Sequence, residues 1–149
     1  MNAIEVIPVR AFNDNYVWTL VDGGNAAVVD PGDAAPVLAY LRDHNLTLTA
    51  ILNTHHHADH VGGNGELLNH FKVPVYGPDD ERITTLTRRM HEGERFVVDG
   101  IGVELKVLEI PAHTRSHISF HNDDMLFCGD TLFACGCGRI FEGTPAQMH

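Results

Sequence analysis

Residues 54–60 read Thr-His-His-His-Ala-Asp-His, directly after the apolar run Leu48–Leu52, which has the composition of a buried strand. In an extended segment, residues two apart point to the same side. His55 and His57 can therefore converge on one metal ion while His56 points away from it. Imidazoles this closely spaced at the end of a buried strand would be costly to hold there without a cation. The stretch therefore predicts a metal site.

A second ion is expected beside the first. Asp59 and His60 lie where the strand gives way to a turn, and they offer a carboxylate oxygen and an imidazole nitrogen. Two further candidates, His113 and Asp130, each follow a predicted strand. Taken alone, a histidine such as His113 is more often an ordinary polar surface residue, and an aspartate such as Asp130 is more often a turn residue. Together with the cluster, the histidine would complete a three-histidine site, and the aspartate has two oxygens with which to bridge the ions.

The nature of these donors restricts the choice of metal. Mixed nitrogen and oxygen ligands suit zinc, iron or manganese better than calcium or magnesium. We expect two divalent metal ions, with zinc first and iron or manganese as alternatives. Downstream, the pair of Cys135 and Cys137 is a weak metal signal and is left unassigned.

The pattern around the cluster predicts an α/β (α+β) fold with a βαβ unit. A helix is expected from an N-cap at Asp33 to about His44, and a shorter one through Leu67, Leu68 and Phe71. Strands are expected at Ile4–Val9, Tyr16–Val21, Ala26–Val29, Leu48–Leu52, Val73–Tyr76, Arg95–Val98, Val103–Ile110, Ile118–His121 and Met125–Cys128.

The length of 149 residues allows one domain with a real core, and we expect a single domain at 1–149. Thr144 and Pro145 have the pattern of a helix start, yet only four residues follow the proline. Isolated helices shorter than about 12 residues are marginal. We therefore expect the natural chain to continue and the domain to be incomplete on its C-terminal side.

Composition and charge narrow the choice of partners. There are 20 acidic and 10 basic residues, a net charge of −10 with neutral histidine, so electrostatic attraction to nucleic acid or to an anionic membrane is not expected. The chain has no apolar run of membrane-spanning length and no secretory signal at its start. Its three cysteines are expected to be free thiols. A cytoplasmic protein is predicted, and its oligomeric state is open.

Beyond these residues, the sequence resembles a known family along its whole length. The stretch 54–60 is similar to the metal-binding signature of the metallo-β-lactamase superfamily, with Asp30, His113 and Asp130 at the remaining positions. Within that superfamily the chain resembles glyoxalase II in the motifs Phe12–Tyr16, Val29–Gly32, Gly129–Phe133, Gly136–Arg139 and Glu142–Thr144. The resemblance implies the N-terminal portion of an αββα sandwich, with the C-terminal part and a helical domain missing.

The resemblance also implies roles for particular side chains. Six of them would be metal ligands: His55, His57 and His113 for the first ion, Asp59 and His60 for the second, and Asp130 as the bridge. Asp59 and Asp130 would be catalytic as well. A hydroxide held between the ions would attack the thioester of S-2-hydroxyacylglutathione, releasing glutathione and a 2-hydroxy acid such as D-lactate in methylglyoxal detoxification. Arg139 matches a basic position that contacts glutathione, and Phe141 stands where the family commonly has tyrosine.

Several departures from the family pattern bear on activity. A further histidine ligand of the second ion would lie beyond residue 149. Before His117, Arg115 and Ser116 replace a stretch that usually ends in glycine. A positive φ at Ser116 would be strained, and we expect it to displace the loop that carries His113.

Three alternatives therefore stay open. The chain could belong to another superfamily hydrolase, such as a lactonase or β-lactamase, or to an iron-dependent persulfide dioxygenase. It could also be a catalytically impaired metal-binding fragment. Asp30 is either a turn former or a residue that orients a ligand histidine, and His56 and His117 are expected to be structural.

Overall fold

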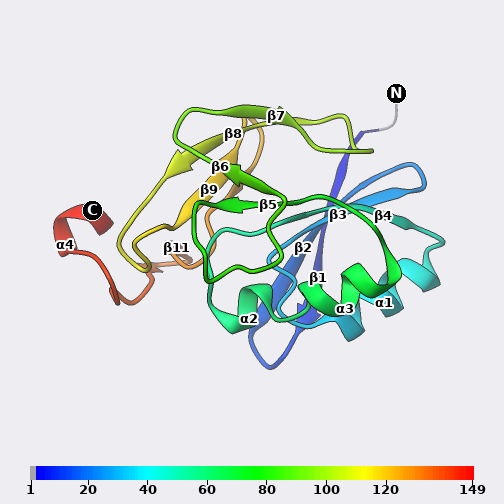
Figure 1. The fold of residues 1–149 in the computed structure, drawn as a ribbon, viewed down its shortest axis with the longest axis horizontal. Coiled ribbons are helices and arrows are strands. Elements are labelled where there is room, and N and C mark those ends of the chain that lie inside the picture. The colour runs from blue at the N-terminus through cyan, green and yellow to red at the C-terminus, as the bar shows by residue number, and fades with distance from the viewer. Residues whose placement is uncertain (1–2) are drawn as a thin grey trace.

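Residues 3–149 are described by the structure, a computed structural model, and they form two facing sheets with helices on the outer face of the first (Figure 1). In these residues the first sheet has the strand order β1-β2-β3-β4-β5-β6. The bounds are β1 Glu5–Ala11, β2 Asn15–Asp22, β3 Asn25–Val29, β4 Thr47–Leu52, β5 Val75–Pro78 and β6 Arg88–Met90. Strands β1 to β3 pair antiparallel, and β3 to β6 pair parallel.

The second sheet is antiparallel, in the order β10-β9-β8-β7. Its strands are β7 Arg95–Val97, β8 Glu104–Glu109, β9 Ile118–His121 and β10 Leu126–Phe127. A small hairpin of β11 (Leu132–Phe133) and β12 (Gly136–Cys137) follows it. The hairpin brings the chain back toward the end of the first sheet where the parallel strands terminate.

Four helices are described: α1 Ala34–Asp43, α2 Ala58–Val61, α3 Asn64–His70 and α4 Pro145–Met148. The N-cap of α1 is Asp33, whose side chain accepts a hydrogen bond from the Ala35 amide at 3.1 Å. Helices α1 and α3 pack on the first sheet (Figure 1). In residues 3–149 no helix has the length and apolar character to cross a membrane.

Successive side chains of β3 and β4 point to opposite faces of the first sheet and belong to two different cores. Val29 and Leu52 belong to the apolar cluster between the two sheets, which also contains Phe120. Val28 and Ile51 point the other way and join the cluster beneath the helices. Because β3 and β4 are covered on both faces, their sequences are almost continuously apolar.

The predicted elements are confirmed, with shifts at their ends. All nine predicted strands and both predicted helices are present, and a capping box at Thr144 begins α4. The strand predicted at Val73–Tyr76 lies two residues later, so Pro78 is its last residue rather than its stop. Proline has no backbone N–H to donate, and it is tolerated there because the strand ends at this residue.

The sequence did not predict β6, α2 or the hairpin of β11 and β12. Strand β6 reads Arg-Arg-Met and has no apolar alternation, and it forms only because its backbone pairs with β5. The other elements have two to four residues each, too short for a periodic pattern.

The carboxyl ends of β3 and β4 meet at one edge of the first sheet, where the Asp30 amide donates to the Leu52 carbonyl at 2.8 Å. Strand β4 runs directly into residues 53–57. The loop before β9 carries His113, and the turn after β10 carries Asp130. The fold therefore brings all the predicted ligands to one end of the two sheets.

Candidate metal centre

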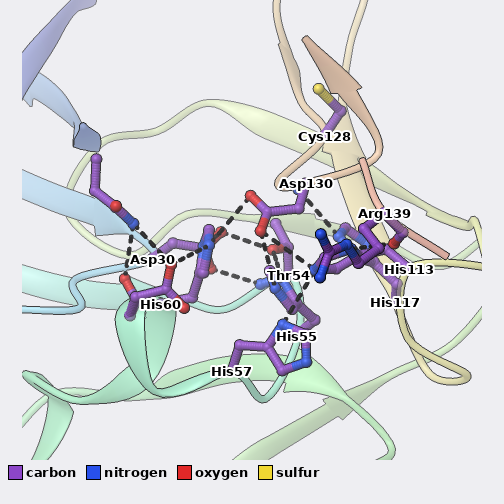
Figure 2. A network of polar contacts seen from close by, with 12 residues as sticks. Asp30, Thr54, His55, His57, His60, His113, His117, Cys128, Asp130 and Arg139 are labelled. Carbon is purple, nitrogen blue, oxygen red and sulfur yellow. Dashed lines mark hydrogen bonds and ion pairs between the residues drawn. The ribbon is translucent and has the colours of Figure 1, made fainter. Parts of the chain in front are cut away.

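Two groups of side chains at this end contain the predicted ligands, and in each group one ligand atom per residue lies within 4.8 Å of the others; a third such group, Asp30, His55 and His60, links the two. The first group is His55, His57, His113 and Asp130, and the second is Asp59, His60 and Asp130. These are the six residues expected as ligands from the sequence, and Asp130 belongs to both groups. Figure 2 shows its carboxylate between the histidines of the two groups.

The two oxygens of Asp130 face different groups. Its Oδ2 lies 3.2 Å from His113 Nε2 and 3.7 Å from His55 Nε2. Its Oδ1 lies 3.2 Å from His60 Nε2 on the other side. This is the arrangement that a bridging carboxylate requires, because each oxygen can bind a different ion.

Hydrogen bonds on the far side of the imidazoles fix which nitrogen points inward. The Thr54 hydroxyl donates to Asp30 at 2.6 Å, so its contact of 2.9 Å with His55 requires the ring Nδ1 to donate. His60 Nδ1 donates to Asp30 Oδ2 at 3.0 Å, and His113 Nδ1 donates to the Arg139 carbonyl at 2.6 Å (Figure 2). All three rings therefore turn Nε2 toward Asp130. Such outer partners are what orient histidine ligands.

The unpaired atoms of this cluster test whether it fits a cation. Within residues 3–149, the Nε2 atoms of His55 and His60 are buried and make no hydrogen bond. Buried polar atoms without a partner are rare and call for an explanation such as a bound ion. The donor set of imidazole nitrogens and carboxylate oxygens fits a divalent transition metal.

The electrostatics point the same way. Burial and the neighbouring imidazoles lower the pKa of His55 far below its usual value, and burial lowers the pKa of His57. Both rings are therefore neutral and able to donate a lone pair. Burial alone would lower the pKa of His60 too, but the surrounding carboxylates, Asp30 foremost, outweigh it and raise the pKa to about 12. The second group thus favours a positive charge at its centre.

Asp59 is held by a residue that composition and spacing did not single out. The Asn15 amide donates to Asp59 Oδ2 at 3.1 Å and to the Asp59 carbonyl at 3.3 Å. Asn15 begins β2, and Gly32 packs against the same carbonyl, where a Cβ would lie 1.9 Å from the oxygen. The only signal of Asn15 in the sequence was its place in the motif Phe12–Tyr16.

The two remaining histidines of the region, His56 and His117, lie outside the ligand groups. His56 Nδ1 faces Asp80 at 3.7 Å, away from the ligands. His117 is fully buried and stacks on His55 with the ring centroids 4.5 Å apart. Its Nδ1 donates to the Ile118 carbonyl and its Nε2 accepts the Asp130 amide at 3.3 Å. Burial lowers the pKa of His117 to about 4, so a neutral ring holds the backbone of Asp130.

The predicted strain at Ser116 is wrong. Outside glycine, the positive φ values in residues 3–149 fall at Phe12, Asp30, Asn45 and Cys135. Serine is accommodated because the backbone at Ser116 is not left-handed, and its hydroxyl donates to Asp80. The loop is not displaced, since His113 lies among the predicted ligands.

The two residues expected to contact substrate lie beside the first group. The Phe141 ring makes T-shaped contacts with the rings of His57 and His113, with centroid distances of 5.5 and 5.2 Å. The Arg139 guanidinium lies 5.6 Å from the centre of the Phe141 ring. Phe141 is 56% exposed, so its outer face is available to a ligand.

A cleft of about 550 Å³ opens beside the second group. Asp59, His60 and Asp130 form its polar end. The apolar residues of its walls come from β2, β10 and β11 and include Tyr16, Trp18, Leu126, Leu132 and Phe133. The centre is therefore open to solvent on this side.

Gly138→Ala is expected to displace Asp130. A Cβ at Gly138 would lie 1.6 Å from the Asp130 carbonyl oxygen and 3.3 Å from His113 Nδ1. Overpacking of this kind costs about 1–3 kcal/mol, and we expect metal affinity to fall by roughly 10-fold or more. Thermal unfolding and elemental analysis measure the two effects.

Gly136→Ala is the matched control, because a Cβ there would meet nothing within 4 Å. Equal metal content and equal stability in the two variants would show that the approach of residue 138 to Asp130 does not matter.

Comparison with known proteins gives the following matches. The sequence model of the family described as "Metallo-beta-lactamase superfamily" matches residues 12–149. The hydroxyacylglutathione hydrolase of Nitrosomonas europaea is 52% identical over 145 residues, which make up 97% of this chain and 55% of that protein. The chain thus spans little more than half the length of this relative.

Two solved structures resemble the fold. The B3 metallo-β-lactamase BLEG-1 gives a TM-score of 0.82 at 24% identity, covering 98% of this chain and 81% of that one, a likeness of fold alone. TTHA1623, solved in a di-iron-bound form, gives a TM-score of 0.79 at 28% identity and covers 96% of this chain and 82% of that one.

Proposed function

The chain belongs to the metallo-β-lactamase superfamily, and from this premise we propose that it is the metal-binding part of a glyoxalase II-type thioester hydrolase. Its substrate would be an S-2-hydroxyacylglutathione such as S-D-lactoylglutathione, and its products glutathione and the 2-hydroxy acid. The observation that carries the proposal is the carboxylate of Asp130, which turns one oxygen toward each of two ligand groups. The name of the Nitrosomonas relative supplies the substrate class.

We assign the ligands as the two groups divide them. His55, His57 and His113 would hold the first ion, Asp59 and His60 the second, and Asp130 both. Zinc is the proposed metal, with iron and manganese as alternatives, and the di-iron form of TTHA1623 supports two ions at such a centre. When bound, divalent ions at such a centre polarise a carbonyl and lower the pKa of water.

The residues of this chain would position the reactants. Asn15 fixes Asp59, whose side chain is half exposed to the cleft, so a carboxylate faces the place where water enters. We assign Asp59 and Asp130 as the catalytic carboxylates, because both line that cleft. Asp130 would hold the two ions, and Asp59 could accept a proton from water through the oxygen that binds no ion.

Arg139 and Phe141 would bind the glutathione part of the substrate. Glutathione carries carboxylates, and Arg139 supplies a positive charge on a protein whose net charge is −10. Phe141 offers an exposed ring next to the first ligand group. The net negative charge disfavours nucleic acid or an anionic membrane as a partner, and the three free thiols support our placement of the protein in the cytoplasm.

The test is metal content per chain, by elemental analysis, together with S-D-lactoylglutathione hydrolysis in the same sample. About two metal ions per chain and turnover are expected. Treatment with a chelator should abolish turnover, and added zinc should restore it.

Other outcomes select the alternatives. Retained metal without turnover would make the chain a metal-binding module, and a single iron with oxygen consumption on a persulfide substrate would favour a dioxygenase. No metal affinity would refute the centre itself.

A further inference from the structure

Three segments that are distant in sequence meet at Arg82. They are the segment after β5, the loop at 111–117 that carries His113, and the segment at 139–143 that carries Arg139 and Phe141. Arg82 Nε and Nη2 donate to the two oxygens of Asp80 at 2.9 and 2.8 Å. Its Nη1 and Nη2 donate to the two oxygens of Glu142 at 2.8 and 3.1 Å. One guanidinium thus binds two carboxylates, each through two hydrogen bonds.

The carboxylates are anchored at their other ends. Asp80 is 7% exposed and accepts the Ser116 hydroxyl. Glu142 Oε1 accepts the Arg115 amide at 3.0 Å. The hydrogen bonds from Arg82 lower the pKa of both carboxyls, that of Glu142 to about 2, so both are ionised at neutral pH.

The segment at 139–143 depends on these contacts for its place. Its other polar links to the His113 loop are the His113 ring donating to the Arg139 carbonyl and the Glu142 amide donating to the Ala112 carbonyl at 3.3 Å. Gly143 packs directly against Ala112, where a Cβ would lie 2.4 Å from the Cα. Glu142 is therefore the side chain that ties this segment to Arg82, while the neighbouring Phe141 is largely exposed.

We propose that Arg82 is a positioning residue for substrate binding, because it holds Glu142 and thereby sets Arg139 and Phe141 against the loop of His113. As far as it concerns a glutathione thioester, the inference rests on the proposed function. Arg82 does not line either ligand group and acts through Glu142. Arginine is required because a lysine has a single ammonium and cannot form two forked pairs at once.

The variants to compare are Glu142→Gln, Arg82→Lys and Arg82→Met. Glu142→Gln leaves the pair of the buried Asp80 and the exposed Arg82 intact and weakens only the link to the 139–143 segment, so it decides the question even if Arg82→Met fails to fold. Arg95→Met is the control, because Arg95 forms a single ion pair, with Glu104, on the exposed surface of the second sheet.

Steady-state kinetics with S-D-lactoylglutathione supply the first measurement. Glu142→Gln and Arg82→Met are expected to raise KM by roughly 10-fold, the loss of charged hydrogen bonds, with a smaller change in kcat and the same metal content as the parent. Arg82→Lys should recover only part of the loss. A parental KM in Glu142→Gln, or an equal loss of kcat and of bound metal, would overturn the proposal.

Amide hydrogen exchange supplies a second measurement that needs no turnover. Residues 139–143 and the Arg115 amide should exchange faster in Glu142→Gln than in the parent chain and in Arg95→Met. If the parent hydrolyses no thioester, the proposed function fails, and exchange alone then decides the positioning role. Unchanged exchange in Glu142→Gln would overturn it.

Discussion

Replacing Asp130 by asparagine is expected to remove at least one metal ion per chain and to lower thioester turnover by more than about 100-fold. The side chain keeps its shape but loses the charge and one of the two acceptor oxygens. In the parent, Oδ1 faces His60 and Oδ2 faces His113, so no single remaining oxygen can serve both groups. Loss of an outer partner of a metal ligand typically costs 10–100-fold, and the effect of a shared ligand should be larger.

The control is Asp123→Asn, which makes the same change of charge in an exposed turn seven positions earlier. Elemental analysis and kinetics on the two variants separate a local effect from a general one. Two ions per chain with parental turnover in Asp130→Asn would show that this carboxylate does not bridge.

Asp30→Asn is expected to destabilise the metal-free chain by about 3 kcal/mol, the range for breaking a buried charge pair. Asp30 is 6% exposed and accepts the Thr54 amide at 2.8 Å, the Thr54 hydroxyl and the His60 ring. An asparagine amide group cannot accept from all of these donors, and His60 would lose its nearest negative charge. Metal affinity should fall as well, by about 10–100-fold, because His60 would no longer be oriented.

Asparagine is chosen because the backbone at Asp30 has φ +54°, a region that asparagine tolerates nearly as well as aspartate. Asp33→Asn is the control, since asparagine is an equally good N-cap for α1. Urea unfolding in the presence of a chelator measures the stability. A free energy of unfolding equal to that of the control would mean that the charge of Asp30 is dispensable.

Much of the fold could be predicted because its strands are regular and buried. The alternation in β2 and the apolar runs of β3 and β4 are local patterns, and the N-cap at Asp33 marked the start of α1. The family model and the relatives confirm both the predicted fold class and the resemblance to glyoxalase II. Strand β6 was missed because its sequence has no alternation of apolar and polar residues. It is extended because its backbone pairs with β5.

The site was predictable where its residues are close in sequence. The spacing of His55, His57 and Asp59 is readable from the chain alone, whereas the contact of Asn15 with Asp59 spans 44 positions. The link between Arg82 and Glu142 spans 60 positions and leaves no local signal. Long-range contacts between polar side chains are decided by the packed fold. The predicted strain at Ser116 was wrong for a local reason, because its backbone is not left-handed.

The wall of the cleft beside Asp59 and His60 contains Trp18, which is 40% exposed and is the only tryptophan of the sequence. Its indole ring stands 5.7 Å from the ring of Tyr16, at the mouth of the second ligand group. Excitation at the red edge of the protein absorption band selects tryptophan. The fluorescence therefore comes from Trp18 alone, at the entrance to the centre. Occupancy of the cleft can be read optically, without a label and without turnover.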